Sequence, residues 1–181
     1  MKKKTILFFC TILIIGVIYW KFQPKIKAFL FERHAIEWSR DVKIKFEDFK
    51  QKPDLSSNKT TNYFIGIQLW SMNVIDAQAK TYFDKNQSWV KDTSSFDFSG
   101  SLKIIKLDFD LLESYTRRIN REIDKIRYDE NVVFSDIENL SLKIYQEYER
   151  KQEEFRKINM TLDEKEKYLR PIINDLLEEQ D

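Results

Sequence analysis

The chain has almost none of the side chains that bind transition metals or form covalent cross-links. Its 181 residues include 1 histidine, His34, and 1 cysteine, Cys10. A single cysteine excludes an intramolecular disulfide and a cysteine-rich metal site. A single histidine excludes a zinc site built from two imidazoles, and its distance in sequence from other catalytic groups favours a surface residue over a member of a catalytic triad.

Acidic residues are missing from the amino terminus, where an apolar run follows three lysines. Residues 1–30 contain 6 lysines and no aspartate or glutamate, and residues 5–20 are uncharged. Such a run is short for a membrane span, but flanking lysines can reach the lipid headgroups. Because no small residues at a cleavage site follow it, residues 1–24 are predicted to be an uncleaved signal anchor with cytoplasmic lysines.

The rest of the chain is expected to lie outside the cytoplasm, in the periplasm or at the cell surface. It holds 25 basic and 30 acidic residues, which argues against nucleic-acid binding. With 42% hydrophobic and 14% aromatic residues overall, the chain can build one core. Residues 30–181 are therefore predicted to form a single extracytoplasmic domain.

Three segments of this domain carry a recognisable pattern. Residues 44–53 read Ile-Lys-Phe-Glu-Asp-Phe-Lys-Gln-Lys-Pro, and residues 83–90 read Phe-Asp-Lys-Asn-Gln-Ser-Trp-Val. Residues 102–113 read Leu-Lys-Ile-Ile-Lys-Leu-Asp-Phe-Asp-Leu-Leu-Glu. Each segment alone is a weak signal, but the three in this order are more specific.

In this order, the segments resemble a bacterial domain family of unknown function that is described as a predicted secreted zinc-dependent protease. Its members carry an Asn-x-Ser-Trp-Val segment, followed by a helix with His-Glu-x-x-His-Phe-Asp and an acidic residue three positions later. The resemblance covers about residues 36–126 and implies a metalloprotease-like scaffold.

The residues that would perform zinc chemistry are absent from this pattern. Aligning Phe109 and Asp110 with the family's Phe-Asp places Ile104 and Asp108 at the two ligand positions and Ile105 at the general base. Isoleucine can neither coordinate a metal nor accept a proton. One carboxylate falls short of the three protein ligands of a catalytic zinc site, so no metal or other cofactor is predicted. The two isoleucines are instead expected to fill the former metal cavity with hydrocarbon.

The acidic residues of this helix admit two interpretations. Asp108, Asp110 and Glu113 could form a metal site of oxygen ligands, but in a chain with 34% charged residues a solvated helix face is favoured. Asp110 and Glu113 match family positions, and together with Ser88 and Trp89 they are the predicted binding residues. For Trp89 a place in the core is favoured over a ligand platform.

Alternating apolar residues predict strands in the first half of the domain. Residues 42–46 are predicted to form one strand, residues 62–74 a long second strand, and residues 77–83 its hairpin partner after a turn at 73–76. Gly66 in the long strand marks a bulge or a close backbone contact. These strands predict an antiparallel sheet of three or more strands.

A period of three to four predicts helices in the second half. The first runs over residues 102–126, and its apolar stripe is expected to pack on the sheet rather than form a dimer interface. The second begins at Ser135 with Glu138 as its capping partner, and the third begins at Thr161 with Glu164, with a possible kink at Pro171. Strands followed by helices predict an α+β fold, with a small antiparallel sheet covered by about three helices.

These features predict a non-catalytic, membrane-anchored protein of the bacterial cell envelope that binds a protein or peptide. One alternative is a hydrolase with an unrecognised site near Asp108. Another is a purely structural envelope protein. The sequence does not specify an oligomeric state.

Overall fold

The computed structural model describes residues 16, 23, 29–71, 73–91 and 98–179. The chain divides into two compact units, Met1–Arg33 and His34–Asp181. The predicted anchor at residues 1–24 lies outside the described residues, apart from Gly16 and Gln23. In the described part of the chain, none of the helices combines the length and apolar character of a membrane span.

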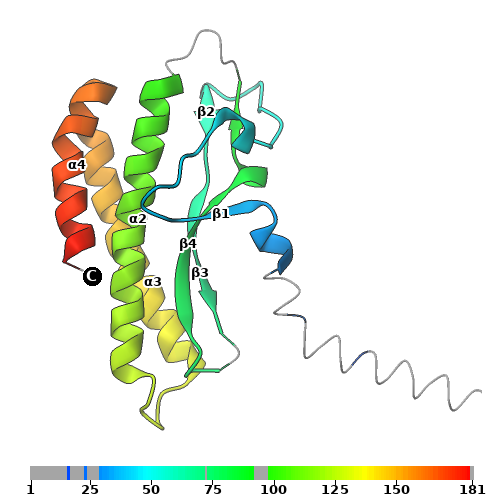
Figure 1. Cartoon of the computed structure of the whole chain (residues 1–181), viewed down its shortest axis with the longest axis vertical. Helices are drawn as coiled ribbons and strands as arrows, with labels where there is room; N and C mark the ends of the chain where they lie inside the picture. The colour runs from blue at the N-terminus through cyan, green and yellow to red at the C-terminus, as the bar shows by residue number, and fades with distance from the viewer. Residues whose placement is uncertain (1–15, 17–22, 24–28, 72, 92–97, 180–181) are drawn as a thin grey trace, which may run out of the picture. The chain divides into compact units, whose positions relative to one another are not determined.

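The second unit has an α+β fold, as predicted, with strands first and helices afterward (Figure 1). A three-stranded antiparallel sheet has the order β1-β4-β3, and a separate antiparallel pair joins β2 to β5. The strands are β1 (Ala35–Glu37), β2 (Thr61–Asn62), β3 (Ile65–Trp70), β4 (Gln78–Asp84) and β5 (Trp89–Val90), and two short 3₁₀ helices are η1 (Phe46–Asp48) and η2 (Lys85–Gln87).

The predicted hairpin is confirmed, since β3 and β4 pair antiparallel from Ile65 with Phe83 to Trp70 with Gln78. The long strand predicted at residues 62–74 is wrong in its extent, because β2 ends at Asn62. The break lies at Phe64, whose backbone N–H donates to Ser88 Oγ at 3.0 Å and whose carbonyl accepts from Asp84 N at 2.9 Å. These bonds divert the chain from one sheet to the other.

Gly66 lies inside β3, where the pairing with β4 continues without a bulge. A Cβ atom at this position would come within 3.0 Å of the Phe64 ring. Neither predicted explanation for this glycine, a bulge or a close backbone contact, is present, because the close neighbour is the side-chain ring of Phe64.

The third strand of the sheet is β1 and not residues 42–46, for which the strand prediction is wrong. Alternation there buries Ile44 but leaves Phe46 exposed. The backbone at this point turns into η1, because the Asp48 carboxylate accepts from Lys45 N at 2.9 Å. Residues 42–46 therefore pack as a loop, because the Asp48 side chain supplies the hydrogen bond that a partner strand would have given to the backbone.

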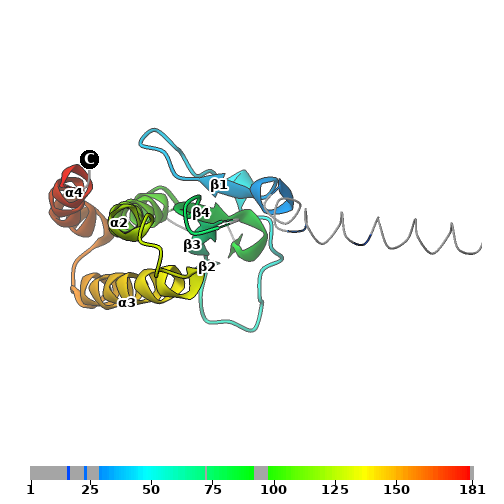
Figure 2. The same cartoon turned by 90° about the horizontal axis from the view of Figure 1, so that it is seen from below.

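Three helices follow, and the first is the centre of the unit. They are α2 (Phe98–Ile126), α3 (Phe134–Lys157) and α4 (Leu162–Glu178). α2 packs on β3 and β4, and α3 and α4 pack on α2. Figures 1 and 2 show α2 between α4 and the sheet. The prediction that the stripe packs on the chain's own sheet is confirmed, and its fully buried members are Ile105, Phe109, Leu112, Ile119 and Ile123.

Side-chain caps fix the starts of the later helices. For α3 the prediction of Ser135 with Glu138 is wrong by two residues, since the cap is Val133, whose backbone N–H donates to the Asp136 carboxylate at 2.9 Å. For α4 the prediction is confirmed, because Thr161 and Glu164 cap each other. The same helix continues through Pro171.

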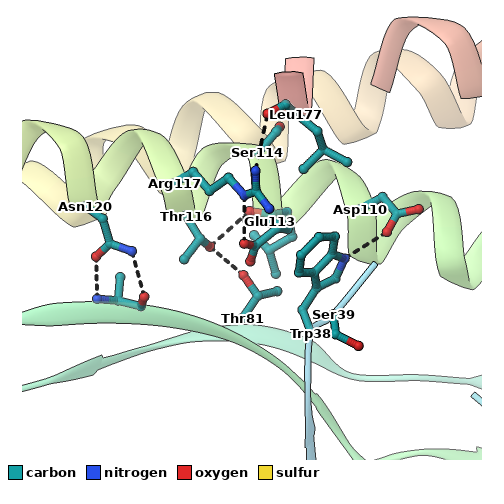
Figure 3. Close-up of polar contacts among 12 residues, drawn as sticks. Trp38, Ser39, Thr81, Asp110, Glu113, Ser114, Thr116, Arg117, Asn120 and Leu177 are labelled. Carbon is teal, nitrogen blue, oxygen red and sulfur yellow. Dashed lines mark hydrogen bonds and ion pairs between the residues drawn. The ribbon is translucent and has the colours of Figure 1, made fainter. Parts of the chain in front are cut away.

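Beyond the end of β1, polar side chains of α2 form hydrogen bonds with the edge of β4. The Asn120 side chain accepts from Ala79 N at 2.7 Å and donates to Ala79 O at 2.9 Å. Next to it, Thr81 Oγ1 donates to Thr116 Oγ1 at 2.7 Å (Figure 3). The helix thus replaces a neighbouring strand for this stretch of the sheet.

We predict that Asn120→Ala lowers the free energy of unfolding by about 1–3 kcal/mol, because it leaves two buried backbone groups of Ala79 without partners. Urea unfolding followed by circular dichroism measures the loss. The matched control is Asn139→Ala on the exposed face of α3, where a change below about 0.5 kcal/mol is expected. Equal losses for the two variants would contradict this role of Asn120.

Candidate functional site

The two isoleucines at the motif positions lie on the amino-terminal half of α2. Ile105 is 1% exposed within the main core, and Ile104 packs partly buried against the same cluster. Both side chains pack in or against the core, and the idea that they fill a former metal cavity stays a prediction. Neither side chain can bind a metal or exchange a proton, and both lie in apolar surroundings.

Asp108, which the resemblance aligns with the second ligand position, is buried in a polar network. Its carboxylate accepts one hydrogen bond from the Tyr63 hydroxyl and a second from Gln152 Nε2 at 3.2 Å. Gln152 also donates to the Tyr148 hydroxyl at 2.7 Å, and Arg156 Nη2 lies 3.9 Å from the carboxylate. The interpretation of Asp108 as part of a solvated helix face is therefore wrong.

Burial controls the ionisation of this network. It raises the pKa of Asp108 above its ordinary value, while the Tyr63 hydrogen bond and the positive charge of Arg156 act in the opposite direction. Burial and the nearby carboxylate raise the pKa of Tyr63 as well, and burial raises the pKa of Tyr148. Both phenols therefore remain protonated donors at neutral pH.

Asp110 is the second buried carboxylate, and donors from three parts of the unit surround it. Its Oδ1 accepts from Trp38 Nε1 at 2.8 Å and from Lys106 Nζ at 2.6 Å, and its Oδ2 accepts from Arg170 Nη1 at 2.5 Å. Figure 3 shows the indole of Trp38 pointing at this carboxylate. At 4% exposure, Asp110 also contradicts the solvated-face interpretation.

Two cations lie over the indole ring that donates to Asp110. Lys106 Nζ and the guanidinium carbon of Arg117 are each 5.2 Å from the centre of the Trp38 ring. A cation at this distance is attracted by the ring face. The ring, the two cations and Asp110 therefore hold the segment after β1 against α2.

A pocket opens beside this cluster, between the segment after β1 and the helices α2 and α4. It encloses about 390 Å³. We call it the Trp38 pocket, and its lining residues are Trp38, Arg40, Lys106, Asp110, Arg170, Asn174, Leu177 and Glu178. Of the predicted binding residues, Asp110 is the one that reaches it.

Glu113 lies one turn further along α2 and is paired within the unit. Arg117 Nε donates to its carboxylate at 3.1 Å, and Arg117 Nη1 donates to Leu177 O at 3.4 Å. Burial raises the pKa of Glu113, although its hydrogen bonds lower it. The residue lines a small polar cavity of about 140 Å³ next to Thr81 and Asn120.

Ser88 and Trp89 are buried in the fold and lie away from the acidic residues of α2. The Ser88 hydroxyl accepts from Phe64 N and donates to Asp84 O at 2.7 Å. Trp89 belongs to β5 and is 5% exposed, which confirms its place in the core. The structure thus does not bring the four predicted binding residues together.

The described residues contain no group of three or more histidine, cysteine, aspartate or glutamate side chains arranged to hold a metal ion. His34 is only partly exposed, with Nε2 at 3.9 Å from Asp84 Oδ2. A site of oxygen ligands does not form on α2 either, because Asp108 and Asp110 bind different partners.

The partners of both buried carboxylates are not predicted from the sequence. The pair of Lys106 and Asp110 has a local signal, since residues four apart meet on one helical face. The other partners, Trp38, Tyr63, Gln152 and Arg170, lie 44 to 72 residues from the carboxylates they bind. Their contacts come from the fold and have no local pattern in the sequence.

Comparison with known proteins gives no match to a protein-family model, a curated protein or a solved structure. The family resemblance of residues 36–126 therefore stays a prediction that rests on the motifs themselves.

We predict that Asp110→Ala lowers the free energy of unfolding by about 3–5 kcal/mol, because it leaves Lys106, Arg170 and the Trp38 indole without their shared acceptor. The control is Asp163→Ala, which removes the surface pair of Lys103 and Asp163 and is expected to cost about 0–1 kcal/mol. Chemical unfolding measures both. Similar small losses would mean that Asp110 does not hold the helices to the sheet.

The raised pKa of Asp108 predicts a pH-dependent contribution to stability. The folded protein holds this proton more tightly than the unfolded chain, whose ordinary value is 3.8. The contribution is full below that pH and falls as the pH rises through the folded pKa. Asp108→Asn removes the titration, so the stability difference between wild type and variant is expected to shift in favour of the variant as the pH rises. Urea unfolding of both proteins across the acidic range tests this, and a difference independent of pH would contradict it.

Proposed function

We propose that this chain is a non-catalytic relative of the predicted secreted zinc-dependent proteases. We propose further that it is anchored in a membrane by residues 5–20, with its main domain outside the cytoplasm, and that it binds a protein or peptide partner there. The observation that carries the proposal is Ile105, which stands at the general-base position and is 1% exposed within the core. A proton acceptor is missing where the family's reaction needs one.

The surroundings of Asp108 support the same proposal. Its carboxylate is engaged by Tyr63 and Gln152, and the neighbouring ligand position is the hydrocarbon of Ile104. A metal ion at Asp108 would have to displace these hydrogen bonds and would gain one protein ligand in exchange. A folded scaffold without this chemistry is suited to binding rather than hydrolysis.

The Trp38 pocket supports the partner-binding part of the proposal. Pockets that hold ligands combine apolar surface with a few fixed polar groups. Here the indole of Trp38 and the side chain of Leu177 supply the apolar surface, and three cations and two carboxylates supply the polar groups.

A hydrolase that uses Asp108 is the alternative with an observation in its favour, namely a buried carboxyl group with a raised pKa. Such groups occur at catalytic sites. Asp108 is, however, 8% exposed, and it accepts from groups of its own chain. The network is explained by the cost of burying a carboxyl group, which its hydrogen bonds offset.

We predict that the purified full chain contains no stoichiometric zinc and that a chelator leaves its unfolding midpoint unchanged. A structural or catalytic zinc would stabilise the folded state through its binding energy, and removing it would lower the midpoint. Elemental analysis and thermal unfolding with and without chelator measure the two quantities. One zinc per chain, or peptide cleavage that the chelator stops, would overturn the proposal.

A further inference from the structure

The Trp38 pocket has a charge distribution that suits one negative charge. Arg40, Lys106 and Arg170 line it together with Asp110 and Glu178, so its ionised lining groups carry a net charge of one positive unit. Two of the cations come from different helices, Lys106 from α2 and Arg170 from α4.

Asp110 holds the two helical cations in place without using all of their donors. Lys106 Nζ donates to Asp110 at 2.6 Å and to Ser39 O at 3.3 Å. Within the described part of the chain, Arg170 uses Nη1 toward Asp110 and Nε toward Glu166. An ammonium group has three donors and a guanidinium group has five, so both retain N–H groups for another acceptor.

The two oxygens of Asp110 already accept three hydrogen bonds. They are therefore poor acceptors for a ligand's own donors, and the pocket favours a ligand that brings acceptors. A carboxylate matches the planar donors of an arginine and carries a single charge. A phosphate dianion would bring a second charge close to Asp110 and Glu178.

The size of the pocket limits how much of a ligand it takes. About 390 Å³ is at the lower end of the range for ligand pockets, which begins near 300 Å³. This is room for the last residues of a chain rather than for an extended segment. Trp38 and Leu177 offer apolar contact to a terminal side chain, and the Asn174 amide offers a partner for the peptide backbone.

We propose that the Trp38 pocket binds the C-terminal carboxylate of a partner polypeptide through Arg40, Lys106 and Arg170. This inference rests on the proposed partner-binding function and adds the group that is recognised. Asp110 acts as a positioning residue that fixes Lys106 and Arg170 at the wall of the pocket.

The test uses the full chain labelled with nitrogen-15 and four probes. The peptide probes are N-acetyl-alanyl-leucine, its carboxamide, and N-acetyl-aspartyl-leucinamide, whose only carboxylate is in a side chain; the fourth is inorganic phosphate. The readout is the indole N–H signal of Trp38, assigned by its disappearance in Trp38→Phe. Hydrogen bonds to a charged carboxylate are stronger than those to a neutral amide. The carboxamide is therefore expected to bind about tenfold more weakly than the acid.

Variants separate the pocket from the rest of the surface. Arg40→Gln and Arg170→Lys are expected to weaken binding of N-acetyl-alanyl-leucine by about tenfold each. Arg170→Lys keeps a cation beside Asp110, and Arg40 is exposed, so both changes are compatible with folding. The matched control is Arg150→Gln on the exposed face of α3, which is expected to leave binding unchanged.

The inference is overturned if the carboxamide or the side-chain carboxylate binds as well as the acid, or if phosphate binds more tightly. It is also overturned if the Trp38 signal does not respond, or if Arg150→Gln weakens binding as much as the pocket variants do. If the purified protein contains no zinc and does not bind the peptide, only this inference is overturned and the proposed function stands. Zinc in the purified protein would remove the proposed function whatever the peptide result.

Discussion

Asp110 is the buried charge that determines how three parts of the second unit meet. An ionised carboxylate without partners costs several kcal/mol to bury, so its donors must stay in place for the fold to persist. Those donors are Trp38 after β1, Lys106 on α2 and Arg170 on α4. Through these hydrogen bonds the one carboxylate joins the segment after β1, α2 and α4 at the wall of the Trp38 pocket.

The same helix lacks the zinc-binding residues of the pattern that its sequence resembles. Four residues away from the hydrocarbon of Ile104, Asp108 is turned inward to Tyr63 and Gln152. The two aspartates of α2 are two residues apart, yet each is bound by its own set of donors. Both carboxylates therefore bind groups of their own chain, and cations line the Trp38 pocket beside Asp110.

Most of the fold could be predicted from the periodicity of apolar residues in the sequence. Apolar residues spaced by three and four predicted α2 and its buried stripe. Alternation and turn residues predicted the hairpin of β3 and β4. The capping box of Thr161 and Glu164 predicted the start of α4, because both partners lie within one turn. Residues 42–46 show the limit of such patterns, since their alternation reflects burial of Ile44 in a loop and not pairing with a strand.

The candidate site was less predictable than the fold. Charged residues on a helix are usually solvated, so Asp108 and Asp110 were expected at the surface. Their burial depends on Tyr63, Gln152, Trp38 and Arg170, which only the folded chain brings close. No local pattern distinguishes a surface aspartate from one whose partners are distant in sequence.

Anomalous diffraction from crystals of the protein soaked in a zinc salt tests the central claim most directly, because it locates bound metal atom by atom. The account predicts no anomalous peak within coordination distance of Asp108 and an intact hydrogen bond from Tyr63 to its carboxylate. A zinc ion bound to Asp108, with Tyr63 displaced, would contradict the claim that this helix has lost its metal chemistry.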